Sequence, residues 1–102
     1  FPLQKGHVLV VPKIEVDKIF EVPDDFLGAL LIFAKPIAKA IEQSFPCNRV
    51  AMVTVGLEVP HAHVHLIPIN EAKDLEFSQP KLKLSKEEFE EIQKTIQSHL
   101  NG

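Results

Sequence analysis

A chain of 102 residues is long enough for one compact domain and too short for two, so we expect a single domain over residues 1–102. Hydrophobic residues make up 45% of it and charged residues 25%, the profile of an ordinary globular domain. The formal net charge is −3, and the lysines are scattered among acidic residues, which leaves no basic face for a nucleic-acid backbone. We therefore expect a small-molecule partner and no nucleic acid.

The cysteine content and the hydropathy pattern bear on the compartment. A single cysteine, Cys47, excludes an internal disulfide, fits a reducing compartment and is typical of a small buried hydrophobe. The longest apolar stretch, residues 26–34, is broken by Gly28 and is too short to span a membrane. No secretory signal pattern is present. These features predict a cytoplasmic protein without a membrane partner.

The first elements in chain order are a strand and a long helix. Gly6–Lys13 is an apolar run rich in valine that is closed by Pro12, as strands often are. Residues 15–23 have apolar side chains at helical spacing for only one or two turns. Pro23–Phe45 then predicts a helix, because proline suits a first helical turn and the run that follows is strongly apolar.

The apolar residues of this long helix go nearly all the way round it. A helix of that kind is covered on more than one side. In a domain of this size, one face would pack on the sheet and another on a second subunit. We therefore expect a homodimer with the Pro23–Phe45 helix at its two-fold interface.

Two more strands and a second helix follow. Arg49–Leu57 and His61–Ile69 are apolar runs typical of strands, and residues 73–84 are polar and irregular. Ser85–Leu100 predicts an amphipathic helix that begins with a capping box completed by Glu88. The order of elements predicts an α+β domain with an antiparallel sheet, one long helix and a C-terminal helix.

Three of the five histidines stand within five residues, at His61, His63 and His65. If they lie on one strand, alternate side chains share a face, and the three imidazoles project from one side. A line of imidazoles makes a poor core, so a purely structural role is disfavoured. The non-functional alternative is three histidines on a solvent-exposed face of the sheet.

A metal site is the sharper alternative. Along an extended strand, the Cα atoms of His61 and His65 would lie about 13 Å apart. Zinc takes ligand nitrogens at about 2.1 Å, which three residues in such a line cannot jointly provide. A metal would need two of them together with His7 or Glu58. The line of rings suits an extended phosphate ester better, because imidazoles can attack phosphorus and can hold or give a proton near neutral pH.

His61-Ala62-His63-Val64-His65-Leu66-Ile67 resembles the signature of the histidine triad (HIT) superfamily. Upstream, residues 2–13 resemble the family's P-x-x-x-G-H-x-L-V-I-P-K segment. The resemblance runs from Pro2 to about Asn70 and is closest to the Hint-like and Fhit-like branches. It implies a HIT-like fold. Because the chain opens at Phe1 without an initiator methionine, the resemblance also implies that the family's first elements are absent from it.

The resemblance implies a role for each histidine. His63 would be the nucleophile that forms a nucleotidyl-histidine intermediate. His65 would bind the α-phosphate and the scissile region and help the leaving group. His61 would stabilise the phosphate and orient the triad, and His7 would be a fourth histidine that supports it. The same resemblance implies a reaction without a metal or another cofactor.

Three further residues are candidates for substrate binding. Gly56 and the turn after it would approach the phosphates. Thr54 stands where many members carry asparagine, and its hydroxyl can still bond a ribose or phosphate with a shorter reach. Glu58 stands where Hint-like members often have a serine donor. An ionised Glu58 that faces the site would repel phosphate oxygens.

These observations predict a nucleotide hydrolase or nucleotidyl transferase that acts at the α-phosphorus of a purine nucleotide conjugate. The conjugate would be a phosphoramidate, an adenylated amine or a dinucleoside polyphosphate. The alternative is a non-catalytic nucleotide-binding or metal-binding module with a vestigial triad, which Thr54 and Glu58 favour. The intact set of four histidines favours the enzyme.

Overall fold

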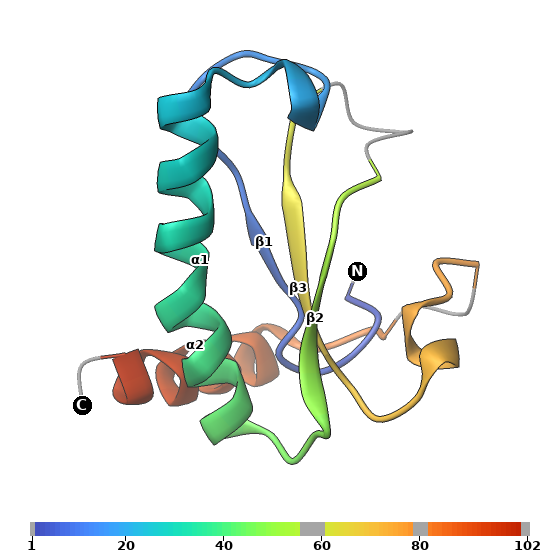
Figure 1. Ribbon diagram of the computed structural model, residues 1–102. Helices are drawn as coiled ribbons and strands as arrows, with labels where there is room; N and C mark the ends of the chain where they lie inside the picture. The colour runs from blue at the N-terminus through green and yellow to red at the C-terminus, as the bar shows by residue number, and fades with distance from the viewer. Residues whose placement is uncertain (1, 56–60, 79–81, 101–102) are drawn as a thin grey trace.

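The computed structural model describes residues 2–55, 61–78 and 82–100 (Figure 1). Its elements, with η for a 3-10 helix, are β1 (Val8–Val10), η1 (Ile19–Glu21), α1 (Asp24–Ser44), β2 (Arg49–Val53), β3 (Val64–Ile69), η2 (Ala72–Leu75) and α2 (Lys86–Leu100). The three strands form one antiparallel sheet in the order β1-β3-β2, so β3 is the central strand. The predicted α+β class, with one long helix and a C-terminal helix, is confirmed.

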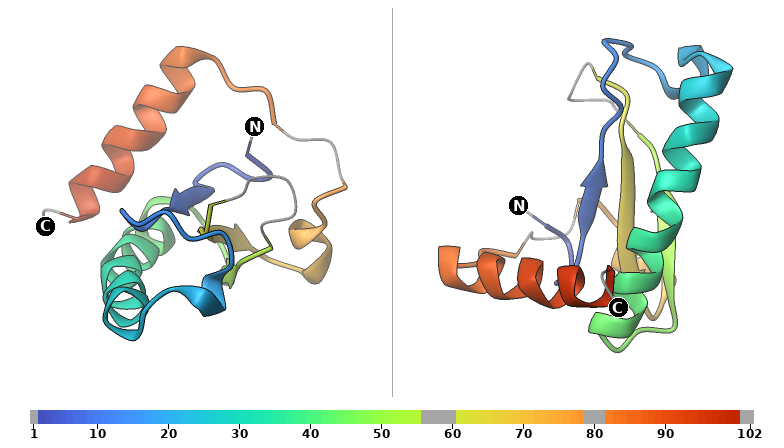
Figure 2. Two further views of the ribbon diagram at one scale, coloured as in Figure 1. Left: turned by 90° about the horizontal axis from the view of Figure 1, so that it is seen from above. Right: turned by 90° about the vertical axis from the view of Figure 1, so that its left-hand side faces the viewer.

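The helix α1 runs along one face of the sheet, and α2 passes behind the lower part of α1 in Figure 1, near the end that leads into β2 (Figures 1 and 2). Val64 and Leu66 of β3 are buried in the core, and His65 between them projects to the other face because side chains alternate along a strand. The sheet therefore has an apolar face towards α1 and a second face that carries the histidine. The buried core cluster consists of Val10, Leu30, Ala34, Ala40, Ile41, Val64, Leu66 and Ile96.

Both long helices begin and end within one residue of the predicted bounds, because their end signals are local. The first turn of α1 follows Pro23 and contains Asp24 and Asp25, whose charges favour the positive end of the helix dipole. At the start of α2, the Glu88 backbone N–H donates to the Ser85 hydroxyl at 3.1 Å, and the Ser85 N–H donates to the Glu88 carboxylate at 3.2 Å. The predicted capping box is thus confirmed.

The strands are shorter than the sequence predicts. β1 spans Val8–Val10 rather than Gly6–Lys13, and β3 begins at Val64 rather than at His61. The β1–β3 register, in which Val10 faces Val64, would place Pro12 opposite Ala62 if the pairing went on. Proline has no N–H for the ladder, so the pairing stops before it. β2 likewise ends at Val53, and residues 56–57 of its predicted range lie outside the described residues.

Two other expectations need correction. Residues 73–84 were expected to be irregular, yet η2 forms at Ala72–Leu75. Cys47 was expected to be buried and is only half-buried. On α1, the outer side chains Ile32 and Phe33 are 76% and 62% exposed, so the sheet and α2 do not cover this helix on all sides. Across residues 2–55, 61–78 and 82–100, no helix is long and apolar enough to cross a membrane.

Candidate active site

The His7, His63 and His65 rings meet on the face of the sheet opposite α1. His7 stands directly before β1, and the antiparallel pairing of β1 with β3 brings it beside His65. The His7 Nε2 and His65 Nδ1 atoms are 2.8 Å apart. The His65 ring centroid lies 5.1 Å from that of His7 and 4.9 Å from that of His63. Three of the four predicted catalytic rings are therefore in contact.

The turn before His7 depends on a glycine. Gly6 has a φ of +91°, a conformation that L side chains rarely adopt. An added Cβ there would also lie 2.7 Å from a ring carbon of Phe45, the residue that ends α1. The sequence Gly6-His7 thus lets the chain turn tightly against α1 and enter β1 with His7 on the histidine face.

The hydrogen bonds of His7 and His65 fix which ring nitrogen carries the proton. The Leu3 backbone N–H donates to His7 Nδ1 at 3.1 Å, so that nitrogen is an acceptor. A neutral His7 then carries its proton on Nε2 and donates it to His65 Nδ1. A neutral His65 in turn carries its own proton on Nε2.

His63 carries its ring proton on Nδ1, whereas His7 and His65 carry theirs on Nε2. Its Nδ1 lies 2.7 Å from the backbone carbonyl oxygen of His61, which can only accept. A neutral His63 therefore has its proton on Nδ1 and its lone pair on Nε2. The side chain is 7% exposed, so it is a buried polar group whose one available donor is satisfied. The lone pair on Nε2 is what a nucleophile at phosphorus requires.

His61 does not stand in line with the other two triad rings on one strand, as we expected. It lies before β3, and its Nε2 donates to the Pro12 carbonyl at 3.1 Å. The next residue, Ala62, donates its backbone N–H to the Val16 carbonyl at 2.6 Å. The segment is therefore held by the loop after β1 rather than by a strand ladder. His61 acts on the cluster through its carbonyl, which orients His63.

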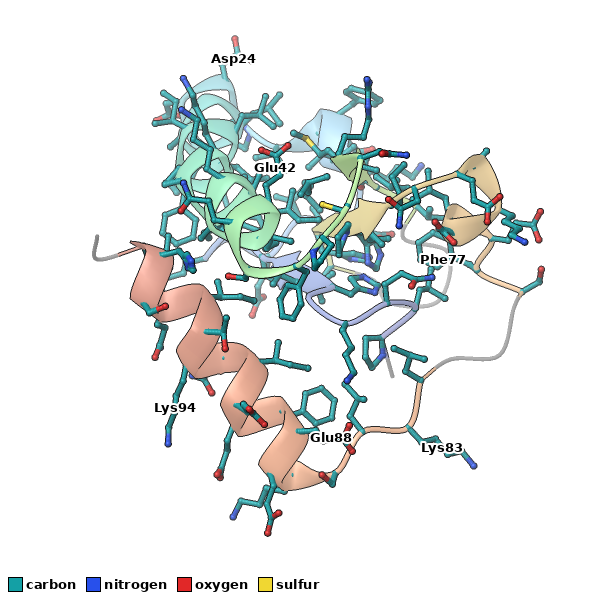
Figure 3. All side chains as sticks on the ribbon, turned by 90° about the horizontal axis from the view of Figure 1, so that it is seen from below. Asp24, Glu42, Phe77, Lys83, Glu88 and Lys94 are labelled. Atoms are coloured by element: carbon teal, nitrogen blue, oxygen red, sulfur yellow. The ribbon has the colours of Figure 1, made fainter. Side chains whose placement is uncertain are left out.

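The structure adds one residue that the sequence analysis did not single out. The Phe77 ring lies 5.0 Å from the His65 ring, centroid to centroid, with the two planes at 68°. Phe77 lies on the side of the sheet opposite α1 (Figure 3). The only available signal was that Phe77 is the sole aromatic residue in the polar stretch between Asn70 and Ser85.

Of the three predicted substrate-binding residues, the described structure contains Thr54. Thr54 is exposed and directly follows β2, whose last residue, Val53, pairs with His65. Gly56 and Glu58 lie outside the described residues.

A groove of about 250 Å³ lies on the other face of the sheet. It is lined by α1, by β2 residues Val50 and Met52, and by Leu66 of β3. None of the four histidines lines it, so it is separate from the candidate site. Within the described ranges, no three histidine, cysteine, aspartate or glutamate side chains are grouped so as to hold a metal ion.

Comparison with known proteins agrees with this geometry. Residues 1–72 match the HIT domain family. An adenosine 5'-monophosphoramidase of Schizosaccharomyces pombe is 33% identical over 97% of this chain and 76% of its own length. An asymmetrical bis(5'-nucleosyl)-tetraphosphatase of the same yeast is 32% identical over 70% of this chain, and the match spans 42% of that protein.

A similar solved structure is that of a hypothetical histidine triad nucleotide-binding protein of Sulfolobus tokodaii. It has a TM-score of 0.83 and 26% identity, and the match covers 99% of this chain and 73% of that one. A Hit-like protein of Bartonella henselae, with a TM-score of 0.81 and 24% identity, shares the fold. The matched residues 1–72 contain all four histidines of the site and both strands that position them. The chain belongs to the HIT domain family.

Proposed function

We propose that this protein is a nucleotide hydrolase or nucleotidyl transferase that acts at the α-phosphorus of a purine nucleotide conjugate. The observation that carries the proposal is the bond from His63 Nδ1 to the His61 carbonyl oxygen, at 2.7 Å. It leaves the Nε2 lone pair of His63 as the nucleophile beside the Nε2–H of His65. One ring is thereby ready to attack and its neighbour is ready to give a proton.

The reaction would proceed in two steps. His63 Nε2 forms a bond to phosphorus while the bond from phosphorus to the leaving group breaks, and His65 Nε2 gives its proton to the leaving group. His65 is then an imidazolate, whose Nδ1 accepts the hydrogen bond from His7, until the second step returns its proton. Water, or another acceptor in a transferase, then displaces the nucleotide from His63 and returns a proton to His65. The His7 ring, held by the Leu3 N–H, keeps His65 in the tautomer that this sequence of steps needs.

The substrate class is supported by the relatives. The proteins of similar sequence include an adenosine 5'-monophosphoramidase and a bis(5'-nucleosyl)-tetraphosphatase. Both names refer to a nucleotide substrate, and the two substrates differ in the group attached to the nucleotide. We propose a phosphoramidate, an adenylated amine or a dinucleoside polyphosphate as substrate. Substrate contacts from Thr54, Gly56 and Glu58, a homodimer and a cytoplasmic location remain part of the proposal.

The test is incubation of the protein with adenosine 5'-phosphoramidate and detection of released AMP, with and without rapid acid quench to trap adenylated protein. Wild type should release AMP and yield an adduct on the peptide that contains His63. His63→Ala should lose about 10³-fold or more in turnover, as enzymes do when a nucleophile is removed. His99→Ala, which changes a histidine on α2, is the matched control and should retain activity. Nucleotide binding without turnover would support the non-catalytic alternative instead.

A further inference from the structure

We propose that Phe77 is a positioning residue that holds the His65 imidazole in the orientation from which it can protonate a leaving group. The inference rests on the proposed function for the chemical step and on the structure for the geometry. His65 has ring neighbours from three separate segments, because His7, His63 and Phe77 all lie with their ring centroids 4.9–5.1 Å from it.

An imidazole needs such neighbours. The outer torsion of a histidine side chain joins a tetrahedral to a planar carbon, so its energy is broad and it does not by itself fix the ring plane. The hydrogen bond from His7 holds one nitrogen of His65, and a ring contact adds a restraint on the plane of the imidazole. The Phe77 ring meets the His65 ring at 68°, in the edge-to-face range that aromatic pairs prefer, and supplies this restraint.

The chain reaches this position by reversing its direction. β3 carries the backbone from His65 to Ile69, a distance of about 13 Å. The segment after it then turns through η2 and comes back along the sheet, so that a residue twelve positions later contacts His65 (Figure 1). We call residues 70–77 the return arm. The contact between Phe77 and His65 therefore depends on the turn that the chain makes through η2.

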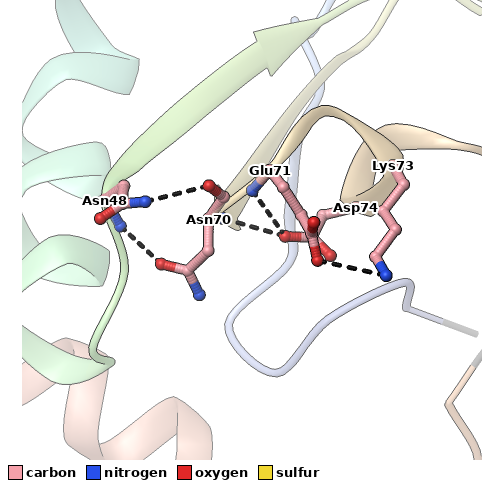
Figure 4. Close-up of polar contacts among 5 residues, drawn as sticks. All are labelled: Asn48, Asn70, Glu71, Lys73 and Asp74. Atoms are coloured by element: carbon pink, nitrogen blue, oxygen red, sulfur yellow. Dashed lines mark hydrogen bonds and ion pairs between the residues drawn. The ribbon is translucent and has the colours of Figure 1, made fainter.

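Hydrogen bonds stabilise the start of the return arm (Figure 4). One Asp74 carboxylate oxygen accepts the backbone N–H groups of Asn70, at 2.9 Å, and of Glu71, at 3.1 Å. Asn70 is itself joined to Asn48 at the start of β2 by two hydrogen bonds of 2.9 Å. These contacts connect the turn to both neighbouring strands, and they set the direction in which the chain returns to His65.

The role predicts a selective defect. Phe77→Leu keeps an apolar side chain on the half-buried position and removes the ring. Since positioned general acids contribute about 10²–10⁴-fold, a less well oriented His65 should cost about tenfold in kcat. The loss should appear with adenosine 5'-phosphoramidate, whose amine must be protonated to leave. It should be less than about twofold with the p-nitrophenyl ester of AMP, whose phenolate leaves without a proton.

Four further variants separate the effect of the ring from that of the arm. Phe77→Tyr retains the aromatic ring and should behave as wild type. Phe89→Leu makes the same change at a phenylalanine of α2 that is 45% exposed, and it should alter neither substrate. Asp74→Ala removes the acceptor that holds the arm, so it should reproduce the selectivity of Phe77→Leu, whereas Lys73→Ala, at an exposed ion pair, should not.

A second measurement is independent of turnover. In ¹⁵N-histidine spectra, wild-type His65 should show an acceptor-type Nδ1 and a protonated Nε2. In Phe77→Leu the two shifts should move towards each other as the ring samples other orientations, and in Phe89→Leu they should not. If wild type cleaves neither substrate, the proposed function fails while the spectra still test the role of Phe77. Unchanged His65 spectra in Phe77→Leu, or an equal loss on both substrates, would overturn the inference.

Discussion

Replacement of Gly6 by alanine tests how the turn before His7 is built. The φ of +91° costs an L residue about 1–2 kcal/mol. The new Cβ would lie 2.7 and 2.9 Å from two ring carbons of Phe45, which packs against the core. Displacing a packed ring adds about 1–3 kcal/mol. We therefore expect Gly6→Ala to lower the free energy of unfolding by about 2–5 kcal/mol, a large part of the 5–15 kcal/mol typical of a domain.

The assay is urea unfolding followed by circular dichroism, because the chain has no tryptophan or tyrosine for fluorescence. With an m-value of about 1.5 kcal/mol per M, the midpoint should fall by about 2 M. Gly28→Ala is the matched control. It lies in α1, where an added Cβ would meet nothing within 4 Å beyond its chain neighbours and its own helix backbone, and it should raise stability by about 0.5–1 kcal/mol. Equal midpoints for wild type and Gly6→Ala would refute the argument.

Four other outcomes are expected. Ser85→Ala should lower stability by about 1 kcal/mol in the same urea assay, because it removes the hydroxyl that caps α2. Burial, and to a lesser degree Glu42, raises the pKa of the Cys47 thiol, so iodoacetamide should alkylate the folded protein more slowly at pH 8 than the urea-unfolded chain. The backbone N–H groups of Asn70 and Glu71 lower the pKa of the Asp74 carboxyl group. The ionised carboxylate therefore stabilises the fold above its unfolded pKa of about 3.9, and this stabilisation is lost as pH falls through the folded pKa. Asp74→Asn should accordingly make the melting temperature depend less on pH in the acid range. Ile32→Glu on the exposed side of α1 should shift a sedimenting dimer to monomer; a wild-type monomer at micromolar concentration would count against the predicted assembly.

The helices could be predicted closely because their limits are set within a few residues of each end. Pro23 and the pair Ser85–Glu88 act on the nearest backbone groups. Strand limits depend on a partner that is distant in sequence. The start of β3 is decided by Pro12, fifty residues away from Ala62, and no pattern within 61–69 reveals it.

The site was predictable in its residue types and not in its proton positions. The spacing of His61, His63 and His65 identified the cluster, and the Gly-His pair before β1 added His7. Which nitrogen donates depends on single backbone groups, such as the Leu3 N–H and the His61 carbonyl, whose positions come only with the fold. Phe77 escaped notice for a similar reason, since its contact with His65 requires the chain to reverse through η2.

The bond between His63 Nδ1 and the carbonyl two residues before it has a consequence for covalent labelling. An imidazole has two nitrogens that an electrophile can modify, and a free histidine gives a mixture of both products. In this protein one of the two is occupied by its own backbone, so an acylating or phosphorylating reagent that reaches His63 should yield a single regioisomer, substituted on Nε2. Peptide mapping with isomer-resolving chromatography would read that outcome directly. The regiochemistry of any adduct is then a property of the fold and not of the reagent.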